Sequence, residues 1–409
     1  DNGISAVASS KLLKEKGVDL IITDHHTVGD ELPEALAIVN PKQADCDFPF
    51  KEICGAQVAW YLCAAVKSEL NLDVKMSDFL DLLCVAIIAD IMPMTSLNFT
   101  MVKQGLKKIK TSPRPAFIEL NSCMRKEKFI SDDIGFLIAP KINSAGRMED
   151  ASTAVKFLLS KTTREAQDGL YALNDLNDYR KTLQEEISCK AMAEVNDEDT
   201  VIVVWGEDWH EGVIGIVASK LSNHYKKPAF VLSINDGVAK GSARSNGEIN
   251  LHEIINQTQD LLLGFGGHKN AAGLSLVKEN LTLFKKNINE IVQFNDKPLH
   301  NHIPTIGVLD VSSVDLDFIS IIEEFEPYGL ENTKPIFQIE NAIILKEEFI
   351  GKDQNHLKLT LKVDGHIIEA LKFHNNYKLN KHKIDLVVSV NKNEFRGVCK
   401  PQFLIQDFL

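Results

Sequence analysis

A short apolar run that ends in one carboxylate and two imidazoles constrains the fold of this chain most. Residues 19–23 are typical of a strand buried in a parallel sheet, and Asp24, His25 and His26 follow them directly. In open α/β sheets, ligands bind at the edge formed by the carboxyl ends of the strands. A carboxylate together with imidazoles suits a divalent cation such as manganese, or magnesium with further oxygen ligands. The sequence therefore predicts an α/β sheet with a metal site at this edge.

The N-terminal part of the chain alternates between helical and strand patterns. The predicted elements are helices over residues 5–16 and 54–70 and strands over residues 18–23 and 37–39. A further strongly apolar run, residues 79–89, ends at Asp90. This alternation predicts a doubly wound parallel sheet.

The rest of the sequence, after the N-terminal part, predicts a long helix, a second α/β domain and a small β-barrel. Residues 163–194 follow a helical pattern, a second α/β region begins at residue 200, and the polar residues 295–304 mark a linker. Short strands follow over residues 336–339, 342–345, 357–363, 367–373, 384–390 and 402–408. The expected parts are an α/β domain over residues 1–160, a connecting helix over 161–197, a second α/β domain over 198–296 and an OB-like β-barrel over 303–409.

Aromatic and Lys side chains in the barrel suit contacts with a nucleic-acid strand. The aromatic residues are Phe337, Phe349, Phe373, Phe395 and Phe403. Such side chains can stack on bases. At strand spacing they also fit a barrel core, so both interpretations stay open.

The acidic composition limits the kinds of partner. The formal net charge of −12 argues against a simple basic coat for nucleic acid, although a metal-loaded cleft with a few Arg and Lys can still be locally positive. The seven cysteines form no Cys-x-x-Cys pair, which favours reduced thiols in the cytoplasm. The longest apolar run, residues 82–89, is too short to cross a bilayer, so we expect no membrane contact.

Two further acidic residues join the predicted metal site. Asp1 would leave a strand that lies upstream, and the following Asn2 and Gly3 permit a sharp turn. Asp90 ends its apolar run, where a carboxylate is costly unless it is paired or binds a metal. Taken alone, the Asp1 motif also fits an ordinary turn, and the Asp90 motif also fits a cap at the end of a helix or strand. Together with His25 they predict three strand-end groups that converge on one divalent ion.

Three stretches of small residues are candidates for binding phosphate or sugar. Residues 142–148 and 241–245 are predicted turns that carry an arginine, and residues 264–273 are a predicted Gly-rich loop that runs toward a helix. Backbone amides in such loops, together with Arg, form good anion sites. His210 is either a ligand or a helix-start residue, with a structural or positioning role favoured. The candidate substrate-binding residues are Asn143, Ser144, Gly146, Arg147, Ser242, Arg244, Gly266, Gly267 and His268.

Taken together, these motifs resemble the DHH phosphoesterase superfamily, and within it the bacterial exonucleases specific for single-stranded DNA. The similar segments, in the family's order, are residues 1–4, 23–26, 32–33, 38–41, 88–93, 141–148, 209–215, 241–244, 266–268 and 325–329. The tripeptide 24–26 alone is a weak signal, whereas the ordered set is specific and spans nearly the whole chain. The resemblance implies a DHH domain over residues 1–160, a DHH-associated domain over 198–296 and a C-terminal barrel of the OB type.

The resemblance implies roles for the residues of the metal site. Asp1 would bridge two divalent ions, Mn²⁺ or Mg²⁺, and His25 and Asp90 would bind one of them. Asp24 would either bind the metal directly or contact the residues that bind it. His26 would stand near the scissile phosphate, so Asp24 and His26 are the catalytic candidates.

The resemblance also implies the substrate and the partners. Arg147, Arg244 and His268 would contact phosphates and the terminal nucleotide. The family degrades single-stranded DNA processively from the 5′ end to mononucleotides, in DNA repair and recombination. The expected partners are single-stranded DNA, a single-strand-binding protein and a recombination helicase, and we expect a monomer.

The chain departs from the family at two places. The family's first motif, an Asp-x-Asp-x-Asp-Gly type of strand end, has no counterpart because the chain starts at Asp1, so we expect further residues upstream. Without them the first metal would lose most of its ligands, and the 409-residue chain should be a weak or inactive nuclease that still binds DNA. At the start of the barrel, residues 329–335 differ from the family's Gly-x-Gly-Asn-Pro-like run.

Two other functions stay open at the level of sequence. A DHH phosphodiesterase for short oligonucleotides or cyclic dinucleotides would share the metal site and the Gly-Gly-His loop, but such enzymes usually lack a C-terminal barrel. A metal-deficient DNA-binding scaffold would keep the fold without its ligands. The presence of residues 24–26 and of Asp90 argues against the scaffold.

Overall fold

The computed structural model describes residues 1–409 except 246, 248, 294–302, 352–353, 374, 376 and 396–397. The chain divides into two units. One contains Asp1–Ser112, Arg125–Ala139 and His302–Leu409, and the other contains Pro113–Met124 and Pro140–Asn301. The linker predicted over residues 295–304 lies largely outside the described residues. Across the described residues, no helix combines the length and apolarity needed to cross a membrane.

The first part of the first unit is built on a pair of parallel strands. As predicted, β1 (Ile21–Thr23) pairs with β2 (Ala37–Val39), with Ile22 opposite Ile38. The surrounding helices are α1 (Val7–Glu15), α2 (Gly55–Glu69), α3 (Leu80–Ala89) and α4 (Ser96–Thr111). Because the two strands are parallel, they end at the same edge. This edge carries Asp24 after β1 and Asn40 after β2.

The apolar run before Asp90 is a helix, so the prediction that Asp90 ends a strand is wrong. Leu83, Cys84 and Ile87 are buried within α3, and Asp90 caps its C-terminus. Periodicity cannot separate a buried helix from a buried strand in so apolar a run, and its length favours the helix.

The C-terminal part of the same unit is a closed five-stranded barrel, as predicted. Its strands are β8 (Phe337–Ile350), β9 (His356–Val363), β10 (His366–Lys372), β11 (Lys383–Phe395) and β12 (Val398–Phe408), in the order β10-β12-β11-β8-β9. Residues 336–339 and 342–345, predicted as two strands, belong to one strand, β8. Of the two residues between them, Asn341 has a φ of 58°, and the register with β11 shifts nearby.

The segment before the barrel is joined to the part that carries the metal-site residues. The Met94 N–H donates a hydrogen bond to the Leu330 carbonyl oxygen at 2.7 Å. The Ser131 hydroxyl donates to the buried Glu326 carboxylate at 3.0 Å. Since Met94 follows Asp90 closely in the sequence, the start of the barrel supports the loop that leaves α3.

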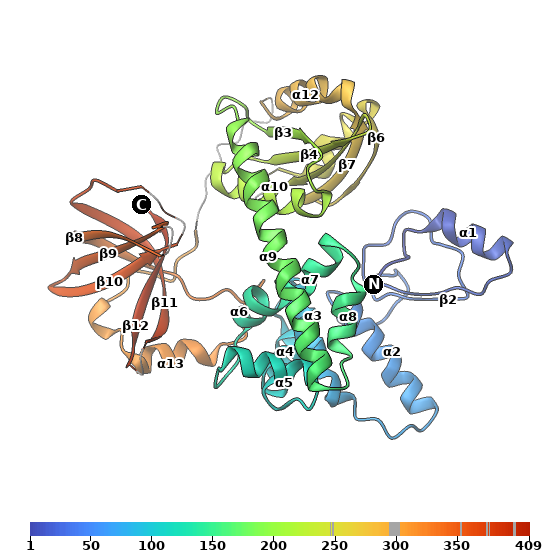
Figure 1. Ribbon diagram of the computed structural model, residues 1–409, viewed down its shortest axis with the longest axis horizontal. Helices are drawn as coiled ribbons and strands as arrows, with labels where there is room; N and C mark the ends of the chain where they lie inside the picture. The colour runs from blue at the N-terminus through green and yellow to red at the C-terminus, as the bar shows by residue number, and fades with distance from the viewer. Residues whose placement is uncertain are drawn as a thin grey trace. The chain divides into compact units, whose positions relative to one another are not determined.

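The second unit contains a five-stranded sheet between two layers of helices (Figure 1). Its strands are β3 (Ile202–Glu207), β4 (Ala229–Asn235), β5 (Val238–Arg244), β6 (Leu262–Gly267) and β7 (Ala271–Val277), in the order β3-β4-β5-β7-β6. Helices α9 (Thr163–Ala193) and α10 (Glu211–Tyr225) cover one face. Helices α11 (Leu251–Asn256) and α12 (Leu281–Gln293) cover the other face. The long helix α9 agrees with the prediction over residues 163–194.

Shorter elements complete the described fold. They are the α-helices α5 (Pro115–Met124), α6 (Ser131–Asp133), α7 (Ala139–Met148), α8 (Ser152–Leu158) and α13 (Leu316–Glu324), the short 3-10 helices η1 (Met76–Phe79), η3 (Gln259–Leu261), η4 (Lys278–Asn280) and η5 (Val311–Ser313), and the π-helix η2 (Ile134–Ile138).

The three small-residue stretches adopt regular structure in place of the predicted turns and loop. Residues 142–148 lie in helix α7, and residues 241–244 complete strand β5. Residues 264–273 form the β6–β7 hairpin, so a strand follows the glycines where a helix was predicted. Small residues are needed here for close packing, since a Cβ at Gly241 would lie 2.8 Å from Leu232 Cγ.

Gly105→Ala should destabilise the protein, because α4 meets α3 at this glycine without room for a methyl group. A Cβ at Gly105 would overlap the Cys84 side chain and the Leu80 carbonyl group. We expect the free energy of unfolding to fall by about 1–3 kcal/mol, measured by urea denaturation. Gly135→Ala is the matched control, since its Cβ would lie 3.7 Å from Ile88 Cγ2, an ordinary contact. Equal stability of the two variants would contradict this packing.

Candidate functional site

His25 is the centre of a cluster of candidate metal ligands in the first unit. Its Nε2 lies 2.9 Å from Asp1 Oδ1 and 3.5 Å from Asp90 Oδ2. Ligands held at about 2.1 Å around one octahedral ion stand roughly 3 Å apart, so each carboxylate has the spacing of a ligand relative to His25 Nε2. Candidate ligand atoms of Asp1, Asp24, His25 and His26 all lie within 4.8 Å of one another. Of the residues predicted to hold a metal, Asp1 and His25 belong to this cluster, and Asp90 joins it through its contact with His25.

Asp24 fixes the loop after β1 by accepting hydrogen bonds. Its side chain is 1% exposed. It accepts from the backbone N–H groups of Ile4 at 2.9 Å, His25 at 2.7 Å and His26 at 3.1 Å. Burial raises the pKa of Asp24, but these hydrogen bonds together with the His26 ring outweigh burial and lower it to about 2. Since both oxygens are engaged, Asp24 is suited to orienting the two histidines.

His26 is anchored through one ring nitrogen. Its Nδ1 lies 2.7 Å from Asp24 Oδ1, and its side chain is 54% exposed. Because a carboxylate accepts the Nδ1 proton, Nε2 remains for contact with a substrate. The Asn40 amide donates to the His26 carbonyl oxygen at 3.0 Å. Asn40 was not singled out from the sequence, although it lies in one of the family-like segments.

The surroundings of His25 and Asp90 favour a bound cation. Burial lowers the pKa of His25 and is only partly opposed by the nearby carboxylates. A neutral imidazole is the form that binds a metal. Burial raises the pKa of Asp90, which also stands at the C-terminus of α3, where the helix dipole disfavours a carboxylate. A divalent cation would offset both effects, so the residues present fit such an ion.

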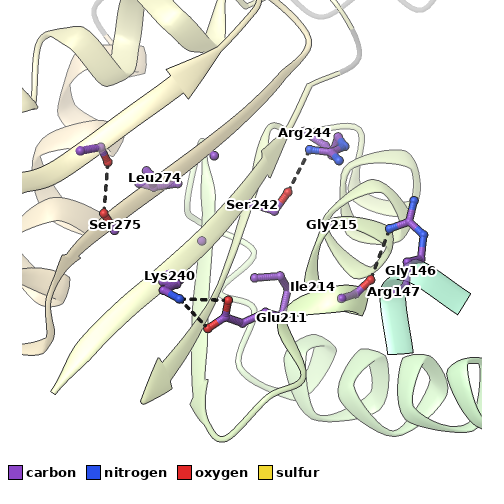
Figure 2. A pocket seen from close by; sticks show the side chains of 14 residues that line it. Gly146, Arg147, Glu211, Ile214, Gly215, Lys240, Ser242, Arg244, Leu274 and Ser275 are labelled. Carbon is purple, nitrogen blue, oxygen red and sulfur yellow. Dashed lines mark hydrogen bonds and ion pairs between the residues drawn. The ribbon is translucent and has the colours of Figure 1, made fainter. Parts of the chain in front are cut away.

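A cavity of about 650 Å³ in the second unit contains two of the predicted anion-binding arginines (Figure 2). Arg147 Nη1 donates to the Gly212 carbonyl oxygen at 3.3 Å, and Arg244 Nη1 donates to Ser242 Oγ at 2.9 Å. Burial and then the charge of Arg147 lower the pKa of Arg244. Within the described part of the chain, neither arginine forms an ion pair with a carboxylate. The cavity therefore offers positive charge to an anionic ligand.

Two glycines of α10 allow the arginines to approach the helix. A Cβ at Gly212 would overlap the Arg147 carbonyl group, and a Cβ at Gly215 would lie 3.0 Å from Arg244 Nη2. His210 caps this helix, with its Nδ1 accepting a hydrogen bond from Gly212 N at 3.1 Å. The helix-start interpretation of His210 is confirmed. Gly212 and Gly215 were quoted as part of a motif but not identified as residues that line a site.

The other predicted anion-binding residues do not line this cavity. Ser144 is buried in α7, where its hydroxyl donates to the Lys141 carbonyl oxygen at 2.6 Å, and Asn143 is exposed. Gly266, Gly267 and His268 lie at the exposed end of the β6–β7 hairpin. The predicted residues that share the cavity are Gly146, Arg147, Ser242 and Arg244.

Arg180 is a third cation close to Arg147 that sequence reasoning missed. It lies on α9 and donates hydrogen bonds to Asn177 Oδ1 at 3.0 Å and Gln184 Oε1 at 2.8 Å. Burial and then the charge of Arg147 lower its pKa. A lone arginine on a long polar helix has the same sequence pattern as an ordinary exposed charge, so no signal in the sequence distinguished it.

The barrel aromatics divide between core and surface. Phe403 is buried, and Phe337 and Phe349 pack against the core. Phe373 is 50% exposed, and its ring centroid lies 5.1 Å from that of His356. The Phe395 side chain lies outside the described residues. Of the four described, Phe373 is therefore the one placed to stack on a base.

Family models match most of the chain. The DHH family N-terminal domain matches residues 1–87, the DHHA1 domain matches residues 198–293, and the RecJ OB domain matches residues 307–407. The fold and the two candidate sites thus define a DHH-type protein with an associated DHHA1 domain and an OB barrel.

Individual relatives narrow this class. The single-stranded-DNA-specific exonuclease RecJ of Bacillus subtilis is 35% identical over all of this chain and 53% of its own length. The Haemophilus influenzae protein of the same name is 32% identical over 99% of this chain and 76% of its own length. The chain therefore belongs to the RecJ family, although it spans about half the length of the Bacillus relative.

A solved structure supports the same assignment. The chain matches RecJ in complex with Mn²⁺ from Thermus thermophilus with a TM-score of 0.86 and 28% identity, over 100% of this chain and 61% of that one. An exonuclease RecJ bound to manganese matches with a TM-score of 0.62 and 33% identity, over 73% of this chain and 77% of that one.

Asp24→Asn should destabilise the protein at neutral pH, because the amide nitrogen would face a backbone N–H that now donates to a carboxylate oxygen. We expect the free energy of unfolding to fall by about 1–3 kcal/mol. The folded-state pKa of Asp24 lies below its ordinary value of 3.8. The difference in the free energy of unfolding between the parent and the variant is therefore complete above about pH 4, and it shrinks as the pH falls toward 2. Urea denaturation of both proteins across this range measures it, and a pH-independent difference would contradict the assignment.

Proposed function

We propose that the chain is the nuclease part of a metal-dependent exonuclease that hydrolyses phosphodiester bonds of single-stranded DNA. The observation that carries this proposal is the convergence of Asp1 and Asp90 on His25 Nε2, at 2.9 and 3.5 Å. Membership of the RecJ family supports the substrate, and the Mn²⁺-bound relative supports the metal.

The proposed chemistry assigns a separate task to each polar group. Two divalent ions, Mn²⁺ or Mg²⁺, would polarise the scissile phosphate and supply hydroxide near neutral pH. Asp1, His25 and Asp90 hold the ions. Asp24 accepts the Nδ1 proton of His26 and holds the ring in place. When the ring is doubly protonated, its Nε2–H would donate to the phosphate and stabilise the charge that develops on its oxygens.

The arginine cavity is proposed to bind the terminal phosphate of the strand. Arg147 and Arg244 face it without carboxylate partners among the described residues. Arginine binds phosphate through paired N–H donors, and Ser242 Oγ adds a further polar group. The 5′-to-3′ direction and the release of mononucleotides follow from the resemblance, and a 5′-terminal phosphate in this cavity would provide that polarity.

The barrel separates this proposal from the closest enzymatic alternative. A phosphodiesterase for short oligonucleotides or cyclic dinucleotides needs no extended surface for the strand. The closed barrel of residues 337–408, with Phe373 exposed, supports a longer single strand. Degradation of a long strand and of a dinucleotide at equal rates would favour the alternative.

A metal-deficient DNA-binding scaffold is the second alternative. It predicts DNA binding without hydrolysis or bound metal, and metal analysis of the purified chain tests it.

We further propose that the exonuclease acts as a cytoplasmic monomer in DNA repair and recombination. A single-strand-binding protein and a recombination helicase are its proposed partners.

In the full-length protein, His26→Ala should lower the rate of DNA hydrolysis about 100-fold or more, because a group that stabilises transition-state charge is lost. Single-turnover release from a 5′-labelled strand with Mn²⁺ measures the rate. Binding of the strand, measured by fluorescence anisotropy, should change little. His224→Ala, at an exposed histidine of α10, is the control and should match the parent. If the His26 variant cleaves as fast as this control, the role of His26 is wrong.

Arg244→Glu should weaken binding of a 5′-phosphorylated strand and lower the salt slope by about one phosphate contact. It should also remove the preference for a phosphorylated over an unphosphorylated 5′ end. Arg164→Glu is the matched control, because it makes the same charge change at a side chain that is 91% exposed. Equal salt slopes and end preference in the two variants would show that Arg244 is structural.

A further inference from the structure

The first residue of helix α2 lies unusually close to a candidate metal ligand. Gly55 is buried and begins this helix. A Cβ built on Gly55 would overlap the Asp1 carboxylate oxygen and would lie 2.6 Å from Asp1 Cβ and Cγ. Real Cβ atoms essentially never approach other heavy atoms so closely. The Asp1 carboxylate thus occupies space that any residue other than glycine would fill.

Two hydrogen bonds place the Asp1 segment against the end of β1. Its nitrogen donates a hydrogen bond to the Thr23 carbonyl oxygen at 2.6 Å. A few residues later, Ile4 N donates to the buried Asp24 carboxylate at 2.9 Å. The segment is therefore held at both ends against the end of β1. Rotation of the Asp1 side chain, which is 72% exposed, would move the carboxylate into solvent but would leave Asp1 Cβ where it is. A methyl group at position 55 would therefore also displace the Asp1 backbone from the end of β1, and either movement takes the carboxylate away from His25.

The start of α2 also favours a carboxylate at this position. The N-terminus of a helix carries partial positive charge, which stabilises a nearby anion. Gly55 brings the helix start against Asp1, whereas the C-terminus of α3 ends at Asp90. The two candidate ligands therefore lie at helix ends of opposite sign.

We propose that Gly55 is a positioning residue of the metal centre, since only glycine at the start of α2 lets the Asp1 carboxylate stay beside His25 Nε2. This inference rests on the proposed function, in which Asp1 and His25 bind the metal. It assigns a role in metal affinity to a residue that has no side chain and makes no contact with the ion.

Gly55→Ala tests the proposal with two readouts, metal affinity and thermal stability, of which affinity should change far more. Loss of a group that orients a ligand typically lowers metal affinity about 10–100-fold, and we expect that loss for Mn²⁺. Alanine is a better helix former than glycine, which offsets part of the cost of displacing Asp1, so the melting temperature should fall by only about a few degrees. A purely structural role would lower stability and leave affinity unchanged. Isothermal titration with Mn²⁺ alone and thermal unfolding of the 409-residue chain measure the two quantities.

Two further variants show whether Gly55 acts through Asp1. Asp1→Asn alone should weaken Mn²⁺ binding, and adding Gly55→Ala to it should cause little further loss, since both changes remove the same ligand. Gly29→Ala is the matched control, because a Cβ at Gly29 would meet nothing within 4 Å. Additive losses in the double variant would overturn the proposal.

The outcomes separate this inference from the proposed function. If Asp1→Asn and His25→Ala leave Mn²⁺ binding unchanged, the metal centre itself is wrongly assigned. If they weaken binding but Gly55→Ala does not, the inference about Gly55 alone fails. A crystal structure of the Gly55→Ala variant without metal tests the proposal independently of metal affinity. The Asp1 carboxylate should have left its 2.9 Å contact with His25, and an unmoved carboxylate would overturn the proposal.

Discussion

The buried Asp24 carboxylate is the interaction on which the metal-site arrangement depends. It accepts hydrogen bonds from Ile4, His25 and His26 and thereby ties the start of the chain to the loop after β1. These donors keep the carboxylate ionised despite its burial, as the low pKa shows. It in turn accepts the Nδ1 proton of His26 and holds the backbone of His25 in place. Without this group, the His26 ring would lose its hydrogen-bond partner and the loop that carries both histidines would lose its anchor.

The two units carry opposite charges where they offer binding groups. In the first unit, carboxylates stand around His25, which suits a cation. In the second unit, Arg147 and Arg244 line a cavity without carboxylate partners among the described residues, and Arg180 lies nearby. The chain as a whole is acidic, with a formal charge of −12. Local arrangement rather than net charge therefore decides which ligand each site attracts.

Sequence patterns predicted some elements well and others poorly, for identifiable reasons. Strand β2 and helix α9 were placed within a residue or so, because each has a clear period and clear ends. Helix α3 was missed, since a wholly apolar run has no period to detect. Residues 142–148 and 241–245 were predicted as turns because their glycines and serines are typical of turns. In the fold, the same small residues serve close packing between elements.

The sequence by itself determined the chemistry of the candidate site: which carboxylates, imidazoles and guanidinium groups are present, and in what order. It also determined the barrel and the long helix, because both follow from local periodicity. Tertiary structure alone decided that Asp1 and Asp90, far apart in the chain, meet at His25, and that Gly266–His268 lie away from the arginine cavity. It also decided that Gly55 must leave room for Asp1. Distances between residues remote in sequence depend on how helices and strands pack, and no local pattern encodes them.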